Sequence, residues 1–182
     1  MAAESTMLPL GTPLPDFTLP DPDGAPHSPS DHPDAVGVLV VFACNHCPYV
    51  LHVGPELGRQ AKGWIDQGLV VLAVNSNDST AYPDDAPELM PGFATGNGWT
   101  FPYLVDEDQA VGRAFRAACT PDFFLFDRDR KLAYRGRFDA SRPSGAEMLT
   151  GEDLGAAVAA VLAGEPVTGD QLPSIGCSIK WK

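Results

Sequence analysis

The amino-acid sequence predicts an α/β fold in which a central mixed β-sheet is flanked by helices. Three short apolar runs, residues 38–42, 69–74 and 123–126, have the length and the β-branched or aromatic composition of strands buried on both faces. The stretch between the first two runs carries apolar residues at helical spacing, and strand, helix, strand in this order forms a right-handed βαβ unit. We therefore expect one sheet of about four or five strands.

The other elements follow from the prolines and glycines that punctuate the chain. The first helix should begin at Pro48, because the first turn of a helix tolerates proline, and should continue to about residue 67. We expect residues 1–14 to form an extended arm. The last helix should begin at Gly151 and end at Gly164. Further helices are expected at residues 84–94 and 108–118, and further strands at residues 16–19, 100–104 and 132–136.

Length and composition indicate one soluble globular domain. The 182 residues suffice for one well-cored domain, which we assign to residues 1–164, with residues 165–182 as an irregular tail that packs on the same domain. No apolar run approaches the roughly 20 residues of a membrane span. The N-terminal residues lack the basic and apolar regions of a signal peptide, so we expect a cytoplasmic protein.

The acidic balance of the chain bears on its partners. The formal net charge is -12 at pH 7, and nucleic acids and anionic membrane surfaces would repel such a protein. We therefore expect neither nucleic-acid nor membrane partners. Persistent disulfides are uncommon in cytoplasmic proteins, so the cysteines of this chain indicate redox or metal chemistry.

Two cysteines with C-x-x-C spacing directly follow the first buried strand. Cys44 and Cys47 come after residues 38–42, and Pro48 places Cys47 at the N-cap of the first helix. The helix dipole and the unpaired amides of the first turn favour a thiolate there, which is the reactive form of cysteine. His46 can add a positive charge near neutral pH. The pattern predicts a reactive sulfur at the end of a strand.

The same spacing also occurs in half of a structural zinc site. Cys119, Cys177, His46 or His52 would have to complete such a site. Structural zinc sites usually pair two C-x-x-C knuckles, whereas Cys119 and Cys177 stand alone in the sequence. Inert buried thiols are a third interpretation. We favour redox chemistry over both, because the pair follows a buried strand.

Four segments of the chain carry a family resemblance. They read GTPLPDFTL at residues 11–19, FACNHCPYV at 42–50, TPDFFLFD at 120–127 and PSIGCSIKWK at 173–182. Together with the order of elements, they resemble the peroxiredoxin-like group of redoxins in the thioredoxin superfamily (alkyl hydroperoxide reductase/thiol-specific antioxidant). The resemblance implies a thioredoxin-like fold in which the Thr120–Pro121 bond is cis and Pro121 faces the cysteines. It also implies that the backbone around Pro121 pairs with an extended substrate segment.

The chain departs from the peroxidase pattern of this superfamily. A peroxidatic cysteine follows a P-x-x-x-T-x-x-C pattern, but Cys44 stands three residues before Cys47, and Val41 three residues before Cys44. The position where a peroxide-binding arginine would precede the third strand carries Thr120 and Pro121. We therefore expect thiol–disulfide exchange, with a peroxiredoxin-like thiol peroxidase as the alternative and a zinc- or copper-binding module as a second alternative.

The resemblance and the helix start divide the roles of the cysteines. In thioredoxin-like proteins the nucleophile lies five residues after a strand aromatic, here Phe42, so Cys47 is the expected nucleophile. Cys44 then resolves the mixed disulfide, whereas a rival alignment makes Cys44 the attacking thiol. The other expected site residues are the substrate-positioning residues Thr120, Pro121, His46 and Pro48 and the possible resolving thiols Cys119 and Cys177.

The expected substrates are protein or small-molecule disulfides, or peroxides, with a thiol reductant that regenerates the cysteine pair. We expect an antioxidant role in redox homeostasis, with neither a cofactor nor a bound metal. Asp84 and Asp85 are interpreted as residues of a solvated turn.

Overall fold

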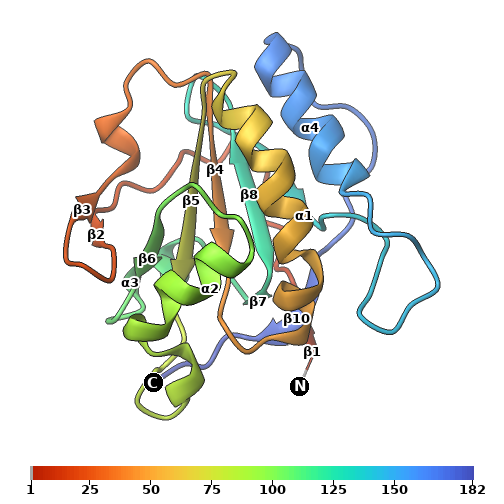
Figure 1. Cartoon of the computed structure of the whole chain (residues 1–182). Helices are drawn as coiled ribbons and strands as arrows, with labels where there is room; N and C mark the ends of the chain where they lie inside the picture. Colours follow the sequence, from red (N-terminus) through yellow and green to blue (C-terminus); the bar gives the residue numbers. More distant parts are fainter. Residues whose placement is uncertain (1) are drawn as a thin grey trace.

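The computed structural model, which describes residues 2–182, is built around a five-stranded mixed sheet (Figure 1). The strand order is β6–β5–β4–β8–β9, with β4–β5 and β5–β6 parallel and β4–β8 and β8–β9 antiparallel. The predicted α/β fold with a central mixed sheet is thus confirmed. The strands are β4 (Gly37–Phe42), β5 (Leu69–Asn75), β6 (Tyr103–Val105), β8 (Asp122–Phe126) and β9 (Leu132–Gly136).

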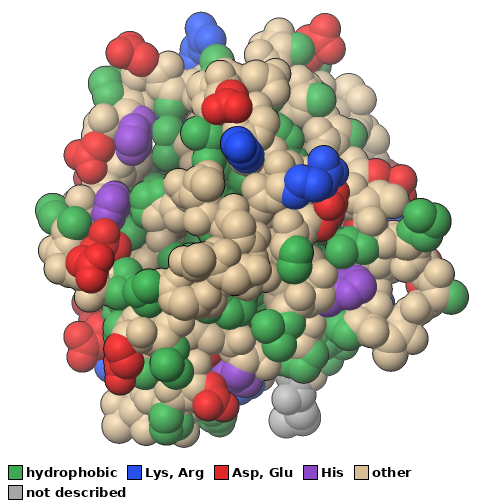
Figure 2. All heavy atoms as spheres, viewed as in Figure 1, with side chains coloured by type: hydrophobic (Ala, Val, Ile, Leu, Met, Phe, Trp, Pro, Cys, Tyr) green, Lys and Arg blue, Asp and Glu red, His purple; other side chains and the backbone are tan. Residues whose placement is uncertain are grey.

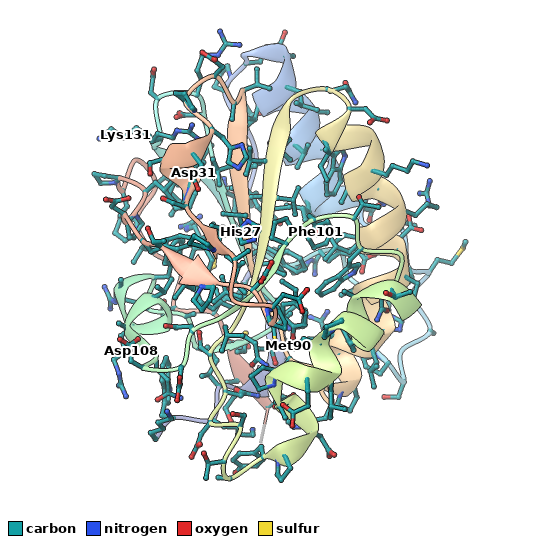
Figure 3. The ribbon with its side chains drawn as sticks, turned by 60° about the vertical axis from the view of Figure 1, so that its left-hand side comes forward. His27, Asp31, Met90, Phe101, Asp108 and Lys131 are labelled. Atoms are coloured by element: carbon teal, nitrogen blue, oxygen red, sulfur yellow. The ribbon has the colours of Figure 1, made fainter. Side chains whose placement is uncertain are left out.

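Side chains that alternate along β4 build an apolar layer on each face of the sheet. Leu39 belongs to the layer under α1, α2 and α4, whereas Val40 belongs to the layer under α3 and the N-terminal arm. Figure 3 shows Met90 and Phe101 on the side of α1 and α2, where they join the first layer. The helices are α1 (Pro48–Ile65), α2 (Met90–Gly96), α3 (Ala110–Ala114) and α4 (Glu152–Ala163).

Prolines account for the largest departure from the predicted elements. The single helix expected at residues 84–94 is wrong, because α2 begins only at Met90, after two short 3-10 turns. Ala86 between these turns is extended, at φ -60° and ψ 142°, and the residue before a proline disfavours the helical conformation. The turns are η2 (Pro83–Asp85) and η3 (Pro87–Leu89).

Two further expected elements are shorter or displaced. The helix expected at residues 108–118 shrinks to α3, since Arg116 takes a positive φ of 53° and cannot continue it. The strand expected at residues 16–19 is replaced by a hairpin that starts later. This hairpin consists of β2 (Leu19–Pro20) and β3 (Pro26–His27), and η1 (Pro29–Asp31) follows it.

The tail, expected to be irregular, contains a strand. β10 (Ile175–Ser178) pairs antiparallel with β1 (Ala2–Glu4) on one side and with β7 (Cys119–Thr120) on the other. Segments from both ends of the chain thus meet in a three-stranded sheet, at the lower end of the molecule in Figure 1. Neighbouring strands on both sides satisfy the backbone of β10, which single-sequence patterns could not anticipate.

Gly176 fixes the register of β10, because no larger residue fits there. A Cβ atom at this position would lie 2.0 Å from the backbone oxygen of Thr120. We expect Gly176→Ala to lower the free energy of unfolding by about 1–3 kcal/mol, the usual cost of overpacking. Denaturant unfolding measures this change.

The matched control is Gly63→Ala on α1, where an added Cβ meets no atom within 4 Å. Alanine should stabilise the helix there by roughly 0.5–1 kcal/mol. A Gly176→Ala protein with an unchanged unfolding midpoint would show that β10 does not pack against Thr120 as described.

Acidic side chains predominate on the surface. Figure 2 shows them scattered over one face of the molecule, in keeping with 24 acidic and 12 basic residues in the chain. Within residues 2–182, no helix combines the length and apolar character that crossing a bilayer requires.

Candidate active site

Cys47 lies at the N-cap of α1, as the sequence predicted. Its backbone is extended, at φ -70° and ψ 120°, and its carbonyl accepts a hydrogen bond from Leu51 N at 2.9 Å. Pro48 takes the first helical position. The sulfur is therefore attached where the helix dipole and the free amides of the first turn favour an anion.

The segment that precedes β8 lies against both cysteines. The Thr120–Pro121 peptide bond is cis, as predicted. In its thiol form, Cys47 Sγ donates a hydrogen bond to Thr120 O at 3.1 Å, and Cys44 Sγ lies 3.3 Å from Thr120 Oγ1. Both cysteines therefore contact the residue that precedes the cis-proline.

Hydrogen bonding separates the pKa values of the two cysteines. The Cys44 thiol donates to the Cys47 sulfur, which is the largest cause of the lowered pKa of Cys47, and the Cys177 thiol adds to the effect against the opposing influence of burial. The Val50 amide also lowers this pKa, although its geometry falls short of a cap hydrogen bond. The pKa of Cys44 is raised by the same bond to Cys47, by burial and by the charge of Asp85. These opposite directions favour Cys47 over Cys44 as the thiolate of the pair.

Both thiols of the pair are closed off from solvent. Cys44 and Cys47 have exposed fractions of 0%, whereas Cys177 is partly exposed. Tyr103 of β6 is buried nearby, and its hydroxyl has no hydrogen-bond partner within residues 2–182. Burial, followed by the charges of Cys44, Asp85 and Cys47, raises the pKa of this hydroxyl. Nothing in the sequence indicated Tyr103, which occupies an ordinary strand position.

Asp85 holds the loop between the two cysteines, so its interpretation as a solvated turn residue is wrong. It is only 1% exposed, and its Oδ1 accepts hydrogen bonds from the backbone N–H groups of Asn45 at 2.8 Å and His46 at 3.4 Å. Its Oδ2 accepts from Asn77 Nδ2 at 2.8 Å. Asn77 follows β5, so the carboxylate ties the loop after β4 to the loop after β5. Asn45 and His46 are 40 and 39 residues away from Asp85 in the sequence, which explains why the turn pattern did not reveal the burial.

The His46 ring lies against the Asp85 carboxylate. Its Nδ1 lies 2.8 Å from Asp85 Oδ2, although the two groups are not aligned for a hydrogen bond. One possible metal-ligand atom from each of Cys44, His46 and Asp85 lies within 4.8 Å of the other two. Two ligands of a tetrahedral zinc ion would lie about 3.3 Å apart, which is longer than the 2.8 Å between these two atoms. His52, also considered for zinc, lies 2.9 Å from Ser141 Oγ instead.

The strand pairing brings Cys177, and not Cys119, to the cysteine pair. Cys177 stands opposite Thr120 in the β10–β7 register, and directly opposed side chains share one face of a sheet. Cys119 occupies the next position of β7, so its side chain points to the other face. There its sulfur lies 3.5 Å from Pro121 O and 3.8 Å from Ser174 O, and burial raises its pKa.

The fold and the site define a class of protein. A cysteine at a helix N-terminus, a second cysteine beside it and a cis-proline segment against both, all carried on a mixed sheet, are the parts of a thiol-redox protein with a thioredoxin-like fold. The model of the AhpC/TSA family matches residues 10–135, which is most of the chain. The chain therefore belongs to the AhpC/TSA family, and the resemblance stated above is confirmed. The match ends within β9, so β10 and Cys177 lie outside it.

Three known proteins illustrate the likeness. A crystal structure of an uncharacterized conserved protein from Geobacillus kaustophilus is 49% identical, with a TM-score of 0.96, and the alignment covers 100% of this chain and 97% of that one. The thiol-disulfide oxidoreductase ResA of Geobacillus kaustophilus (strain HTA426) is 30% identical over 71% of this chain and 70% of its own length. The thioredoxin domain of a thiol-disulfide oxidoreductase from Bacteroides vulgatus has a TM-score of 0.59 at 20% identity, over 70% of this chain and 88% of that one, which supports the fold alone.

Proposed function

We propose that this protein is a thiol–disulfide oxidoreductase in which Cys47 is the nucleophile and Cys44 the resolving thiol. The observation that carries the proposal is the contact of both sulfurs with Thr120, next to the cis-proline, with Cys47 at the N-terminus of α1. A helix N-terminus lowers the pKa of a thiol, and the thiolate is the attacking form. The name of the ResA relative, a thiol-disulfide oxidoreductase, supports the same activity.

The proposed reaction balances within the cysteine pair. The Cys47 thiolate attacks one sulfur of a substrate disulfide, a mixed disulfide forms, and the other substrate sulfur leaves as a thiolate. Cys44 then attacks Cys47 Sγ, the mixed disulfide breaks, and the proton of Cys44 goes to the departing substrate thiolate. The substrate gains two electrons, and the protein keeps a Cys44–Cys47 disulfide. A thiol reductant returns the pair to the starting state.

His46, Thr120, Pro121 and Pro48 position this chemistry in the proposal. Pro48 starts the helix, and the backbone of Thr120 touches the attacking sulfur. The contact of His46 with Asp85 keeps the loop between the cysteines in place. These contacts support a positioning role for the four residues, and the reacting atoms belong to the cysteines.

Two assays on one preparation test the activity. With dithiothreitol as the electron donor, the wild-type protein should reduce insulin disulfides faster than it consumes hydrogen peroxide. Cys47→Ser should reduce insulin at the rate measured without protein, because no other thiol is held as a thiolate at a helix N-terminus. Cys119→Ser is the matched control and should keep the wild-type rate, since this thiol faces away from the pair.

The comparison of the two rates decides between the alternatives. A protein that consumes peroxide rapidly and leaves insulin intact is a thiol peroxidase, and the proposed exchange activity is then wrong. Full insulin reduction by Cys47→Ser would assign the nucleophile to another cysteine.

A further inference from the structure

The thiol of Cys177 is held against the cysteine pair by the strand that carries it. Cys177 lies opposite Thr120 and shares its face of the sheet, where Thr120 Oγ1 contacts Cys44. The Cys177 side chain packs on the apolar cluster that contains Cys44 and Cys47, and its closeness to Cys47 is among the causes that lower the pKa of Cys47 and raise that of Cys177. Cys47 therefore has two thiol neighbours, one from its own loop and one from β10.

This placement is fixed and does not depend on a free-moving tail. On one side of Cys177, Ser174 Oγ donates to Pro121 O at 2.6 Å, and Gly176 has no room for a side chain against Thr120. On the other side, Lys180 N donates to Asn77 Oδ1 at 2.8 Å. A shift by one residue would drive a Cβ atom into the Thr120 carbonyl, so Cys177 keeps its place opposite Thr120.

β10 occupies the edge that was expected to receive a substrate. The resemblance implied that the backbone next to Pro121 pairs with an extended substrate segment, but in the structure residues of the same chain take that position. Ile179 N adds a hydrogen bond to Ala118 O at 3.1 Å and extends the pairing. The chain thus presents its own cysteine where a substrate residue would stand.

We infer that Cys177 is a third redox-active thiol, which exchanges with the Cys44–Cys47 disulfide to give a Cys47–Cys177 disulfide. This inference rests on the proposed function and extends it with a further reacting residue. In the step, Cys177 loses its proton and attacks Cys47 Sγ, so that the Cys47–Cys177 bond forms and the Cys44–Cys47 bond breaks. Cys44 leaves as a thiolate and takes up a proton. The number of electrons in the protein does not change, and no external oxidant is needed.

The exchange replaces a fully buried partner of Cys47 in the disulfide by a partly exposed one. Cys44 is fully buried, whereas Cys177 is partly exposed. Cys177 Sγ on β10 therefore offers a thiol reductant a more exposed sulfur than Cys44 Sγ does. Reduction at this sulfur leaves the Cys47 thiolate, ready for the next turnover.

Cys177 is a weaker nucleophile before Cys47 has reacted than after it. Burial comes first among the causes that raise the pKa of Cys177 to about 12, and the hydrogen bond to Cys47 and the negative charge of Cys47 follow. Disulfide formation at Cys47 removes the last two causes. The positive charge of Lys180 lowers the same pKa throughout. Cys177 thus becomes a better nucleophile at the stage at which the exchange requires one.

The test uses the full chain and dithiobis-nitrobenzoate, which releases one coloured thiolate for each attack. In Cys44→Ser, Cys47 should attack the reagent and release a first equivalent, and Cys177 should then displace a second. The protein should retain no reagent, and a digest should contain a Cys47–Cys177 peptide. The double variant Cys44→Ser/Cys177→Ser should release one equivalent and keep the reagent as a stable adduct, seen by intact mass.

Cys44→Ser/Cys119→Ser is the matched control and should behave as Cys44→Ser does. The wild-type protein, oxidised with one equivalent of diamide and mapped after alkylation, provides a check without substitutions and should contain both disulfides. A Cys44→Ser protein that keeps the adduct, or a disulfide that maps to Cys119, would overturn the inference while leaving Cys47 as the nucleophile. A Cys44→Ser protein that releases no first equivalent would overturn the proposed function together with the inference.

Discussion

Cys47→Ser is expected to abolish alkylation of the reduced protein by iodoacetamide at pH 6, whereas Cys44→Ser should still be alkylated at Cys47, at a lower rate. The neighbouring Cys44 thiol, followed by the Cys177 thiol and the Thr120 hydroxyl, lowers the pKa of Cys47 to about 5 against the effect of burial. At pH 6 most of Cys47 is then thiolate, while a cysteine with an ordinary pKa near 8.5 is less than about 1% thiolate. Cys177, whose pKa is raised to about 12, should not react at this pH.

The pH profile of the alkylation rate shows in which direction the pKa of Cys47 is shifted. In the wild type the rate should rise through the lowered pKa of Cys47 and be nearly constant above pH 6. Cys44→Ser removes the largest cause of the lowering, so its profile should move to higher pH. The midpoint is the quantity to compare, because burial of the sulfur slows the reaction in every variant. If Cys44 is the thiol alkylated at pH 6, the helix N-cap does not select the nucleophile, and the rival alignment replaces ours.

Asp122→Asn is expected to stabilise the protein increasingly as the pH rises from 5 to 8. Asp122 follows the cis-proline and is 0% exposed, and its Oδ1 has no hydrogen-bond partner within residues 2–182. Burial raises its pKa from 3.8 to about 8, against weaker opposing bonds from the amides of Ala118 and Phe123. The folded protein therefore keeps a proton that the unfolded chain loses above about pH 4. Folding stability falls with pH across this interval, because the unfolded state binds fewer protons.

The expected size of the effect follows from the linkage relation. Each pH unit between the two pKa values costs about 1.36 kcal/mol, so the wild type should lose on the order of 3–4 kcal/mol relative to Asp122→Asn between pH 5 and pH 8. Denaturant unfolding at several pH values measures this slope. The asparagine amide can add a constant change to the free energy of unfolding of the variant. This constant cancels when the difference between the two proteins is compared at several pH values.

Asp139→Asn is the matched control, since the pKa of Asp139 is shifted the other way. Burial raises this pKa, but the bonds from Ser141, Gly151 and Thr150 outweigh it, and the net pKa lies below 3.8. Its contribution to stability is complete above pH 5 and is lost only at lower pH. The difference between Asp139→Asn and the wild type should therefore stay constant from pH 5 to 8. A flat difference for Asp122→Asn as well would show that Asp122 is ionised in the folded protein.

The sequence predicts the sheet and the cysteine pair well because both depend on local patterns. The runs that became β4, β5 and β8 are continuous and apolar, and Pro48 marks the start of α1. The cis bond before β8 was implied by the family resemblance and is present. Each of these features can be recognised within a window of about ten residues.

The surroundings of the cysteines could not be predicted, because they depend on contacts between distant segments. Asp85 resembles any turn aspartate until the loops after β4 and β5 close around it. Residues 175–178 resemble a tail until β1 and β7 supply hydrogen bonds on both sides. Cys177 was only one of two possible resolving thiols in the sequence, and the strand register distinguishes it from Cys119.

The β1–β10–β7 sheet also affects the protein while it is being made. Cys47 and the start of α1 lie in the first third of the chain, but the strand that packs beside the sulfur contains residues 175–178. At the usual rate of about 5–20 residues per second, a ribosome needs on the order of ten seconds to synthesise the intervening segment. During that interval the nascent chain lacks β10, so the Cys47 sulfur is without the strand that packs beside it in the finished molecule. Each new molecule therefore passes through a short period in which Cys47 is open to oxidants and to the thiols of other nascent chains.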